Sequence, residues 1–157
     1  MEIVLFEPEI PPNTGNIARL CAAYGVVLNL VGKLGFSLED KYLKRAGCDY
    51  WPHVKLRVWS AWDNFVADAG QRGRLIMTST KGRQKLPDFE FLPGDFLVFG
   101  PETRGLPEDL LAHSQWTVRL PELAWDEGGV RSLNLSTTAG IFLYAALVSS
   151  GLMADFC

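Results

Sequence analysis

Segments typical of strands and segments typical of helices alternate along the whole chain, and this alternation constrains the fold more than any other feature. The short apolar runs Glu2–Phe6 and Val26–Val31 predict buried strands. Between them, Asn13–Tyr24 has apolar residues at helical spacing. Repetition of this unit indicates a parallel sheet that is covered by helices on both faces. We therefore predict an α/β fold with a mostly parallel sheet.

The rest of the chain continues the pattern without a linker or an internal repeat, so residues 1–157 are predicted to form one domain. The further strands are predicted at Val54–Trp59, Leu75–Thr78, Phe96–Phe99 and Thr117–Leu120. The further helices are predicted at Leu38–Ala46, Ala61–Ala69, Pro107–His113 and Leu133–Val148.

Composition narrows the class of protein. With 157 residues, of which 48% are hydrophobic and 21% charged, the chain is typical of a soluble globular domain. Three cysteines without a CxxC pair and two distant histidines predict neither a disulfide framework nor a metal site. The N-terminus lacks the basic segment of a signal peptide, and the longest apolar run, Ala139–Val148, is about half of a membrane span. We therefore expect a cytoplasmic protein that does not contact a membrane.

The predicted closing helix, Leu133–Val148, is apolar nearly all round. A helix without a polar stripe has to be covered on every side. A second copy of the chain would provide this cover, so we predict a homodimer.

The first polar segment, Asn13–Arg19, lies where a strand passes into a helix. Asn13 and Thr14 are suitable helix caps, and the N–H groups at a helix start attract anions. Arg19 follows one to two turns later, within reach of a phosphate or a developing oxyanion. Taken alone, the segment also fits a capped helix with a surface arginine.

The second polar segment, Phe99–Leu106, directly follows a strand, at the sheet edge where α/β proteins bind ligands. Gly100 and Gly105 permit a ligand to approach the backbone closely, although a simple tight turn would need them too. The chain contains neither a Walker loop nor a GxGxxG motif, which disfavours a flavodoxin-like or other phosphate-cradling enzyme.

The third segment, Gly128–Gly140, leads from a diglycine through polar residues into the apolar helix. Ser132, Asn134 and Ser136 bring hydrogen-bonding groups to the helix start. Helix capping explains one or two of them but not all three together with Arg131. A binding or catalytic role is therefore favoured for this segment.

In order, these segments resemble the three motifs of the SpoU-type branch of the SPOUT RNA methyltransferases. The matching patterns are N-x-G-N-x-x-R at Asn13–Arg19, F-G-x-E-x-x-G-L at Phe99–Leu106 and R-S-L-N-L-S at Arg131–Ser136. The resemblance covers nearly the whole chain. It implies transfer of a methyl group to a ribose 2′-hydroxyl and an α/β-knot, a deep trefoil knot near the C-terminus.

Within that branch, further stretches are similar to the tRNA methyltransferases that modify the ribose of the wobble cytidine or uridine. These stretches are Glu7–Asn16, Asp40–Tyr50 and Thr80–Gly82. Two departures occur: Ser79 stands where those enzymes often have threonine, and Val130–Ser136 reads V-R-S-L-N-L-S rather than S-R-S-M-N-L-S. The resemblance thus implies tRNA as a partner, through its anticodon stem-loop.

The resemblance also implies that S-adenosyl-L-methionine is the cofactor, held mostly by backbone groups of three loops. The residues that match its binding loops are Thr78, Ser79, Thr80, Gly100, Glu102, Gly105, Leu120, Ser132, Leu133 and Asn134. No metal is implied. Glu102 is expected to organise its loop and to lie near the Arg19 region of a second subunit.

By the same resemblance, Arg19 is the catalytic arginine, and Asn13, Ser132 and Asn134 position the ribose and Arg19. Arginine is a very poor base because its pKa exceeds about 12. We therefore expect Arg19 to orient the substrate and stabilise developing negative charge rather than to remove a proton. The general base is not identified by the sequence.

A net charge of −3 argues against a surface coated with basic residues, so contacts with RNA must come from local clusters. The candidates for these contacts are Lys41, Lys44, Arg45, Lys81 and Arg83. Three alternatives remain open: a non-catalytic RNA-binding protein of the same fold, an RNA methyltransferase with a different target nucleotide, and methylation of a base instead of a ribose.

Overall fold

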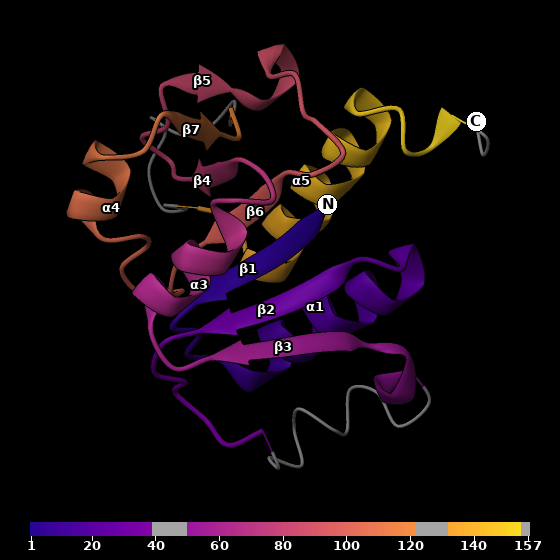
Figure 1. The fold of residues 1–157 in the computed structure, drawn as a ribbon, viewed down its shortest axis with the longest axis vertical. Coiled ribbons are helices and arrows are strands. Elements are labelled where there is room, and N and C mark those ends of the chain that lie inside the picture. Colours follow the sequence, from indigo (N-terminus) through magenta and orange to yellow (C-terminus); the bar gives the residue numbers. More distant parts are fainter. Residues whose placement is uncertain (39–49, 122–131, 155–157) are drawn as a thin grey trace.

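The computed structural model describes residues 1–38, 50–121 and 132–154. In these residues the strands form a seven-stranded sheet of order β3-β2-β1-β6-β4-β7-β5 (Figure 1). Every pairing in it is parallel. The strands are β1 (Glu2–Phe6), β2 (Val27–Val31), β3 (Lys55–Trp59), β4 (Leu75–Thr78), β5 (Gln84–Lys85), β6 (Phe96–Phe99) and β7 (Trp116–Arg119).

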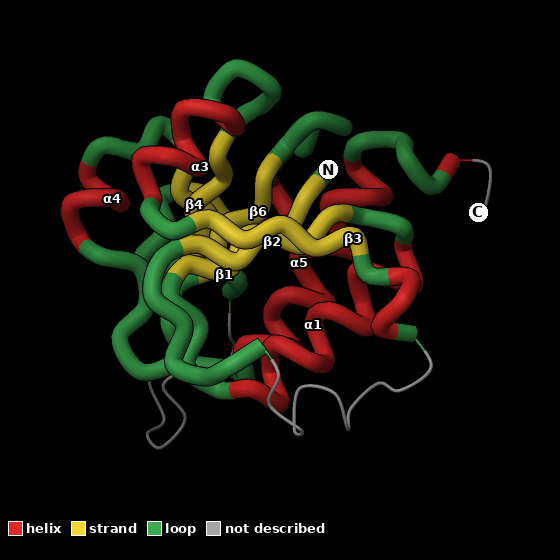
Figure 2. Tube along the Cα trace, turned by 60° about the horizontal axis from the view of Figure 1, so that its bottom comes forward, coloured by secondary structure: helices red, strands yellow, loops and turns green. Residues whose placement is uncertain are grey.

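Helices cover both faces of the sheet, as predicted. Figure 2 shows α1 (Pro11–Tyr24) and α5 (Leu135–Ser149) on one face, and α3 (Trp62–Ala69) and α4 (Glu108–Ala112) on the other. Two 3₁₀ turns, η1 (Trp51–His53) and η2 (Leu86–Asp88), complete the described elements. The α/β prediction with a parallel sheet is therefore confirmed.

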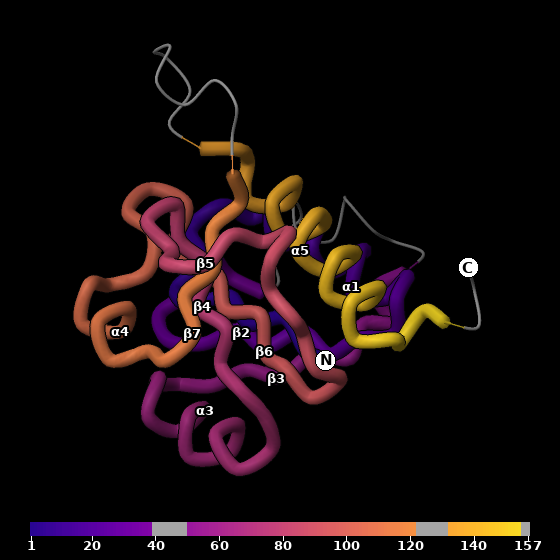
Figure 3. Tube along the Cα trace, turned by 90° about the horizontal axis from the view of Figure 1, so that it is seen from above, coloured from indigo at the N-terminus to yellow at the C-terminus, as the bar shows by residue number. Residues whose placement is uncertain are grey.

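Each face of the sheet has its own apolar core. On the first face, α1 and α5 lie side by side (Figure 3), and Ile17 and Phe142 are fully buried beneath them. On the second face, Phe65 of α3 packs its ring against Trp59, Trp62 and Phe96. The two cores hold the central strands β1 and β6 from both sides.

The order of the strands determines where a ligand can bind. From the central strand β1 the chain passes through α1 to β2 on one side, while β6 pairs with β1 on the other. In open parallel sheets, the crevice at such a switch point, at the carboxyl ends of the strands, is the usual ligand site. The segments that follow β1, β4, β6 and β7 all emerge at this edge because the strands are parallel.

The start of α1 differs from the prediction. The helix begins at Pro11 rather than at Asn13, and its N-cap residue, Ile10, makes no side-chain capping bond. Two prolines favour this early start because proline has a helical φ and needs no hydrogen-bond acceptor in the first turn. Asn13 and Thr14 are therefore not caps but buried residues inside the helix, and the Thr14 hydroxyl has no partner in the described structure.

Other differences are small or lie outside the described residues. Strand β5 was not predicted, since its two residues are too few to show an alternating pattern. Most of the predicted helix Leu38–Ala46 lies outside the described part. So do residues 122–131, which link β7 to α5, and the knot therefore remains a prediction. Within the described ranges, no helix is long and apolar enough to cross a membrane.

Replacement of Phe65 by alanine tests the second core. Phe65 is completely buried and contacts three aromatic rings, so Phe65→Ala should lower the free energy of unfolding by about 3–5 kcal/mol. Urea denaturation followed by circular dichroism measures the loss. The control is Leu92→Ala, since Leu92 is 51% exposed. Equal effects of the two substitutions would contradict the assignment of Phe65 to the core.

Candidate functional site

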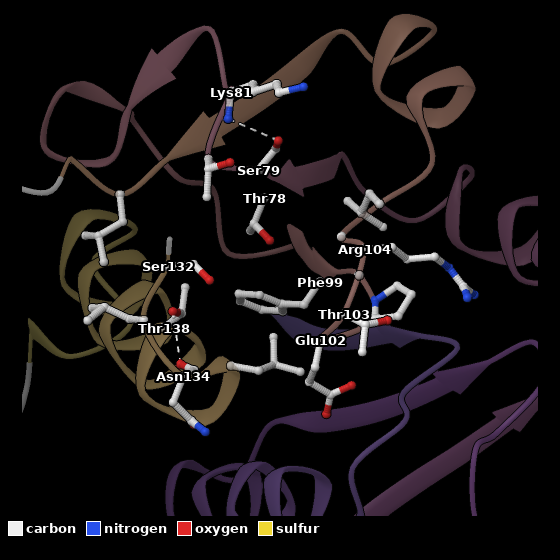
Figure 4. Close-up of a pocket in the computed structure, with 18 of the residues that line it drawn as sticks. Thr78, Ser79, Lys81, Phe99, Glu102, Thr103, Arg104, Ser132, Asn134 and Thr138 are labelled. Carbon is white, nitrogen blue, oxygen red and sulfur yellow. Dashed lines mark hydrogen bonds between the residues drawn. The ribbon is translucent and has the colours of Figure 1, made fainter. Parts of the chain in front are cut away.

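A cavity of about 680 Å³ opens at the carboxyl ends of β4, β6 and β7 and at the start of α5 (Figure 4). Its lining includes Asn13 from the catalytic prediction. It also includes every residue predicted to bind the cofactor, namely Thr78, Ser79, Thr80, Gly100, Glu102, Gly105, Leu120, Ser132, Leu133 and Asn134. The fold thus brings together segments that are far apart in the sequence.

The cavity has an apolar part and a polar part. Phe99 projects into it from β6 (Figure 4) and meets Phe142 of α5 edge to face, with ring centroids 5.7 Å apart. On the polar side, Thr78 donates its hydroxyl to Val98 O at 2.9 Å. An apolar slot with a few polar groups at its rim is the usual form of a small-molecule site.

A chain of hydrogen bonds joins the three motifs. The Asn13 side-chain amide donates to Glu102 Oε1 at 3.1 Å, and Asn134 Nδ2 donates to Asn13 Oδ1 at 2.9 Å. Glu102 also accepts the backbone N–H groups of Glu9, at 2.9 Å, and of Ile10, at 3.3 Å. Because an ionised carboxylate only accepts hydrogen bonds, Glu102 fixes which way round the Asn13 amide lies. Asn13 in turn requires a donor from Asn134.

Asn134 holds the start of α5 as well. Its Oδ1 accepts the backbone N–H of Ser136 at 2.8 Å and that of Thr137 at 3.4 Å, as an N-cap residue does. The Ser136 hydroxyl donates to the same oxygen at 2.7 Å. One side chain therefore serves both the helix start and the contact with Asn13.

A second set of contacts closes the outside of the glycine-containing loop. Arg104 extends away from the middle of the cavity (Figure 4) and pairs with Glu7 at 2.6 Å and with Glu9 at 3.6 Å. Glu9 Oε2 also accepts the Thr103 hydroxyl at 2.8 Å. The backbone N–H of Thr103 donates to the same oxygen at 3.1 Å. These two hydrogen bonds from Thr103, more than the charge of Arg104, lower the pKa of Glu9 below its ordinary value. The carboxylate therefore remains ionised at neutral pH.

Two glycines are required by the shape of this loop itself. A Cβ on Gly100 would lie 2.3 Å from the backbone nitrogen of Leu106, which is far too close. Gly105 has a φ of +70°, in the left-handed region that favours glycine. The sequence left two reasons open for these glycines, close approach of a ligand and a tight turn, and the structure shows that the turn already demands them.

Arg19 is the one predicted catalytic residue that does not line the cavity among the described residues. It is exposed on α1, and its guanidinium carbon lies 5.7 Å from the centre of the Tyr50 ring. The structure therefore brings Asn13, Ser132 and Asn134 together and leaves Arg19 outside the cavity of its own chain.

The predicted RNA contacts differ in their environments. Lys81 lines the cavity and is 84% exposed, with Glu108 as a partner at 4.0 Å. Arg83 is engaged within the chain: it donates to the backbone oxygens of Ser114 and Gln115. These contacts hold Arg83 within the fold, whereas the Lys81 side chain is largely exposed to solvent. Lys41, Lys44 and Arg45 lie outside the described residues.

Sequence reasoning missed several residues of the site. Thr138 and Phe142 line the cavity from α5. Their spacing of four and eight residues from Asn134 is a signal that they share its helix face. Tyr50 gave no such signal, because its contact with Arg19 is a tertiary one.

The described residues also limit the chemistry of the site. No histidine or cysteine lines the cavity in the described structure, and the described part holds no cluster of side chains suited to a metal ion. Cys21 is buried in the core, and burial raises the pKa of its thiol to about 12. It therefore stays protonated and unreactive at neutral pH.

Comparison with known sequences identifies the family. Residues 1–144 match the SpoU rRNA Methylase family. The chain belongs to this family. Among curated members, a tRNA (cytidine(34)-2'-O)-methyltransferase from Methylovorus glucosotrophus is 50% identical over 149 residues, which cover 92% of each chain. Another, from Burkholderia ambifaria, is 45% identical over 152 residues, or 95% of each chain.

Solved structures agree with this placement in the SpoU family. A structure from work on 2-OH methylation of C/U34 on tRNA superposes with a TM-score of 0.88 at 44% identity and covers 94% of both chains. The SpoU methyltransferase AviRb from Streptomyces viridochromogenes, solved in complex with AdoMet, superposes with a TM-score of 0.79. At 24% identity over 59% of its own length, AviRb supports the shared fold.

Substitutions of Asn134 separate its two contacts. Asn134→Ala removes the cap of α5 and leaves the buried Asn13 Oδ1 without a donor, so we expect it to lower the free energy of unfolding by about 2 kcal/mol. Asn134→Asp keeps an oxygen for the cap but faces Asn13 with an acceptor, so part of that loss should remain. Chemical denaturation measures both.

The control for these variants is Thr137→Ala, which shortens an exposed side chain in the same helical turn and should change the free energy of unfolding by less than about 0.5 kcal/mol. If Asn134→Asp were as stable as the wild type, the bond to Asn13 would contribute nothing to stability.

Proposed function

We propose that this SpoU-family chain transfers a methyl group from S-adenosyl-L-methionine to the ribose 2′-hydroxyl of the wobble cytidine or uridine of tRNA. The observation that carries this proposal is the convergence of all three motif segments on one cavity. The curated relatives at 45–50% identity are named for this same reaction at cytidine 34 of tRNA. A ribose target is thus favoured over a base target.

The cavity fits the proposed cofactor in size and chemistry. Partly exposed apolar side chains that line the cavity, among them Leu120, Leu133 and Leu135, offer a surface suited to a flat purine ring. The turn at Ser79 and the loop Gly100–Gly105 offer backbone and hydroxyl groups to the polar parts of a nucleoside. When bound, the cofactor supplies a methyl group on a sulfonium, which is open to displacement by an oxygen nucleophile.

The residues of the chain must then prepare the ribose hydroxyl for attack. A hydroxyl is a poor nucleophile at neutral pH, so its developing negative charge has to be stabilised and its proton accepted. We propose that Arg19 stabilises this charge, since a guanidinium keeps its proton and is therefore a poor base. Asn13, Ser132 and Asn134 would orient the ribose, with Glu102 fixing the Asn13 amide.

We further propose that the active unit is a homodimer with shared sites. On the outer face of α5, Ile141, Tyr144 and Val148 are 38%, 52% and 47% exposed, a continuous apolar stripe at helical spacing. Arg19 does not line the cavity of its own chain in the described structure. A second copy seated on α5 would cover the stripe and bring its own Arg19 towards this cavity.

The tRNA contact is proposed to centre on the anticodon stem-loop. Lys81 is an exposed cation at the rim of the cavity, placed for a phosphate of the bound RNA. Cytoplasmic location, a single domain over residues 1–157 and the C-terminal knot belong to the same proposal. Membership of the SpoU family supports them.

Nucleoside mass spectrometry tests the reaction. Unmodified tRNA is incubated with the protein and S-adenosyl-L-methionine, and the digest should contain 2′-O-methylcytidine or 2′-O-methyluridine from position 34. Arg19→Ala should lower turnover at least about a hundredfold while the cofactor affinity from calorimetry is retained. Lys55→Ala, at the opposite edge of the sheet, is the matched loss of a cation and should leave turnover unchanged.

The other outcomes discriminate between the alternatives. Detection of a methylated base would show that the reaction is base methylation. A methyl group on the ribose of another nucleotide would show that the target is not position 34. Absence of cofactor binding at millimolar concentration would favour a non-catalytic RNA-binding protein. Wild-type turnover in Arg19→Ala would show that Arg19 is structural.

A charge placed on the α5 stripe tests the homodimer. Val148→Glu should yield a monomer in sedimentation velocity, because the glutamate would be buried without a partner at the interface. Methyl transfer should fall at least about tenfold with it if the sites are shared. Val58→Glu is the matched control, as Val58 is similarly exposed at 52% but lies on the edge strand β3. A monomeric variant with full activity would contradict shared sites.

A further inference from the structure

The environment of Arg19 is unusual for an arginine on a helix surface. In the described structure it makes no ion pair and does not line the cavity at the start of α5. The contact it does make is with the face of the Tyr50 ring, whose centre lies 5.7 Å from the guanidinium carbon. Among the described residues, its guanidinium is therefore partnered by an aromatic ring and not by a carboxylate. This environment suits a cation that stabilises negative charge on a bound substrate.

Tyr50 is itself fixed to the same helix. Its hydroxyl donates to the backbone oxygen of Gly15 at 2.7 Å, one helical turn before Arg19. The ring packs against the core on the α1 side of the sheet, and this burial raises the pKa of Tyr50, with the charge of Arg19 acting in the opposite direction. Tyr50 thus remains a neutral phenol at physiological pH and keeps its hydrogen bond to α1.

The geometry of a cation over a ring has a chemical advantage over an ion pair here. An aromatic face attracts the positive charge of the guanidinium without occupying its N–H groups as an oxygen acceptor would. These N–H groups therefore stay available to donate to a substrate oxygen. A carboxylate partner would occupy those same N–H groups and cancel the charge. An aromatic ring can hold Arg19 in place without either cost.

We propose that Tyr50 is the positioning residue for Arg19: its hydroxyl is fixed to the Gly15 carbonyl and its ring holds the guanidinium ready for the substrate. The role of Arg19 in this inference rests on the proposed function. Tyr50 would touch neither cofactor nor RNA and would act only through Arg19. Restriction of a long, flexible side chain before the substrate arrives lowers the entropy lost in the reaction.

Two substitutions of Tyr50 separate its ring from its hydroxyl. Tyr50→Leu removes the ring face, so kcat should fall by about tenfold to a hundredfold, while the KM and the dissociation constant for the cofactor stay unchanged. Tyr50→Phe keeps the ring and loses the hydrogen bond to Gly15, so its kcat should lie between those of the wild type and Tyr50→Leu. Tyr24→Leu is the matched control: Tyr24 is the last residue of α1, is 40% exposed and makes no ring contact in the described structure.

A double-mutant cycle shows whether Tyr50 acts through Arg19. In the background of Arg19→Ala, Tyr50→Leu should have no further effect on kcat, because the group it positions is gone. If Tyr50→Leu lowered kcat by the same factor in both backgrounds, or left it at the wild-type level, the proposal would be overturned. Melting temperatures confirm that each variant is folded, and Tyr50→Phe provides the conservative test if Tyr50→Leu does not fold.

A spectroscopic measurement keeps this inference separate from the proposed function. The Arg19 Nε–H resonance in a nitrogen-15 NMR spectrum should be shifted upfield by the ring of Tyr50. The shift should persist in Tyr50→Phe and vanish in Tyr50→Leu. A wild-type protein that shows this shift but no methyl transfer would disprove the proposed function and leave the contact intact. A protein that transfers methyl groups without the shift would disprove the positioning role alone.

Discussion

The site depends on two hydrogen bonds of Asn13, which donates to Glu102 and accepts from Asn134. They join the loop after β6, the first turn of α1 and the N-cap residue of α5. Each bond is directional, because an asparagine amide has one donating and one accepting end. Once the Glu102 carboxylate accepts from Asn13, the side-chain amides of Asn13 and Asn134 each have only one favourable orientation. The polar face of the cavity is therefore built into the protein before any ligand arrives.

Much of this arrangement could be predicted from local patterns. The alternation of apolar strands with helices was sufficient for the parallel α/β fold, since each element carries its own periodicity. The glycines at 100 and 105 and the polar residues 132 and 134 marked two of the loops that meet in the cavity. Such residues stand out because they interrupt apolar segments without contributing to the core, which indicates a role in a turn or a binding site.

What the patterns missed depends on contacts between distant residues. Asn13 looked like a helix cap, yet Pro11 and Pro12 start the helix earlier and leave its amide free to bridge Glu102 and Asn134. Arg83 looked like a free cation for RNA, but it is engaged by backbone oxygens of the segment before β7. The partner of Arg19, Tyr50, lies 31 positions away in the sequence. No local spacing reports such a pairing.

The bond between Asn13 and Asn134 spans 121 positions of the chain, and this has a consequence for how the protein is made. A growing chain on the ribosome already contains β1, α1 and the loop Gly100–Gly105 before residue 134 is synthesised. One side of the cavity is nevertheless missing until α5 packs beside α1. Recognition of a small molecule therefore begins only when the last helix docks, and a chain cut short before that point carries all the strands of the sheet but no finished site.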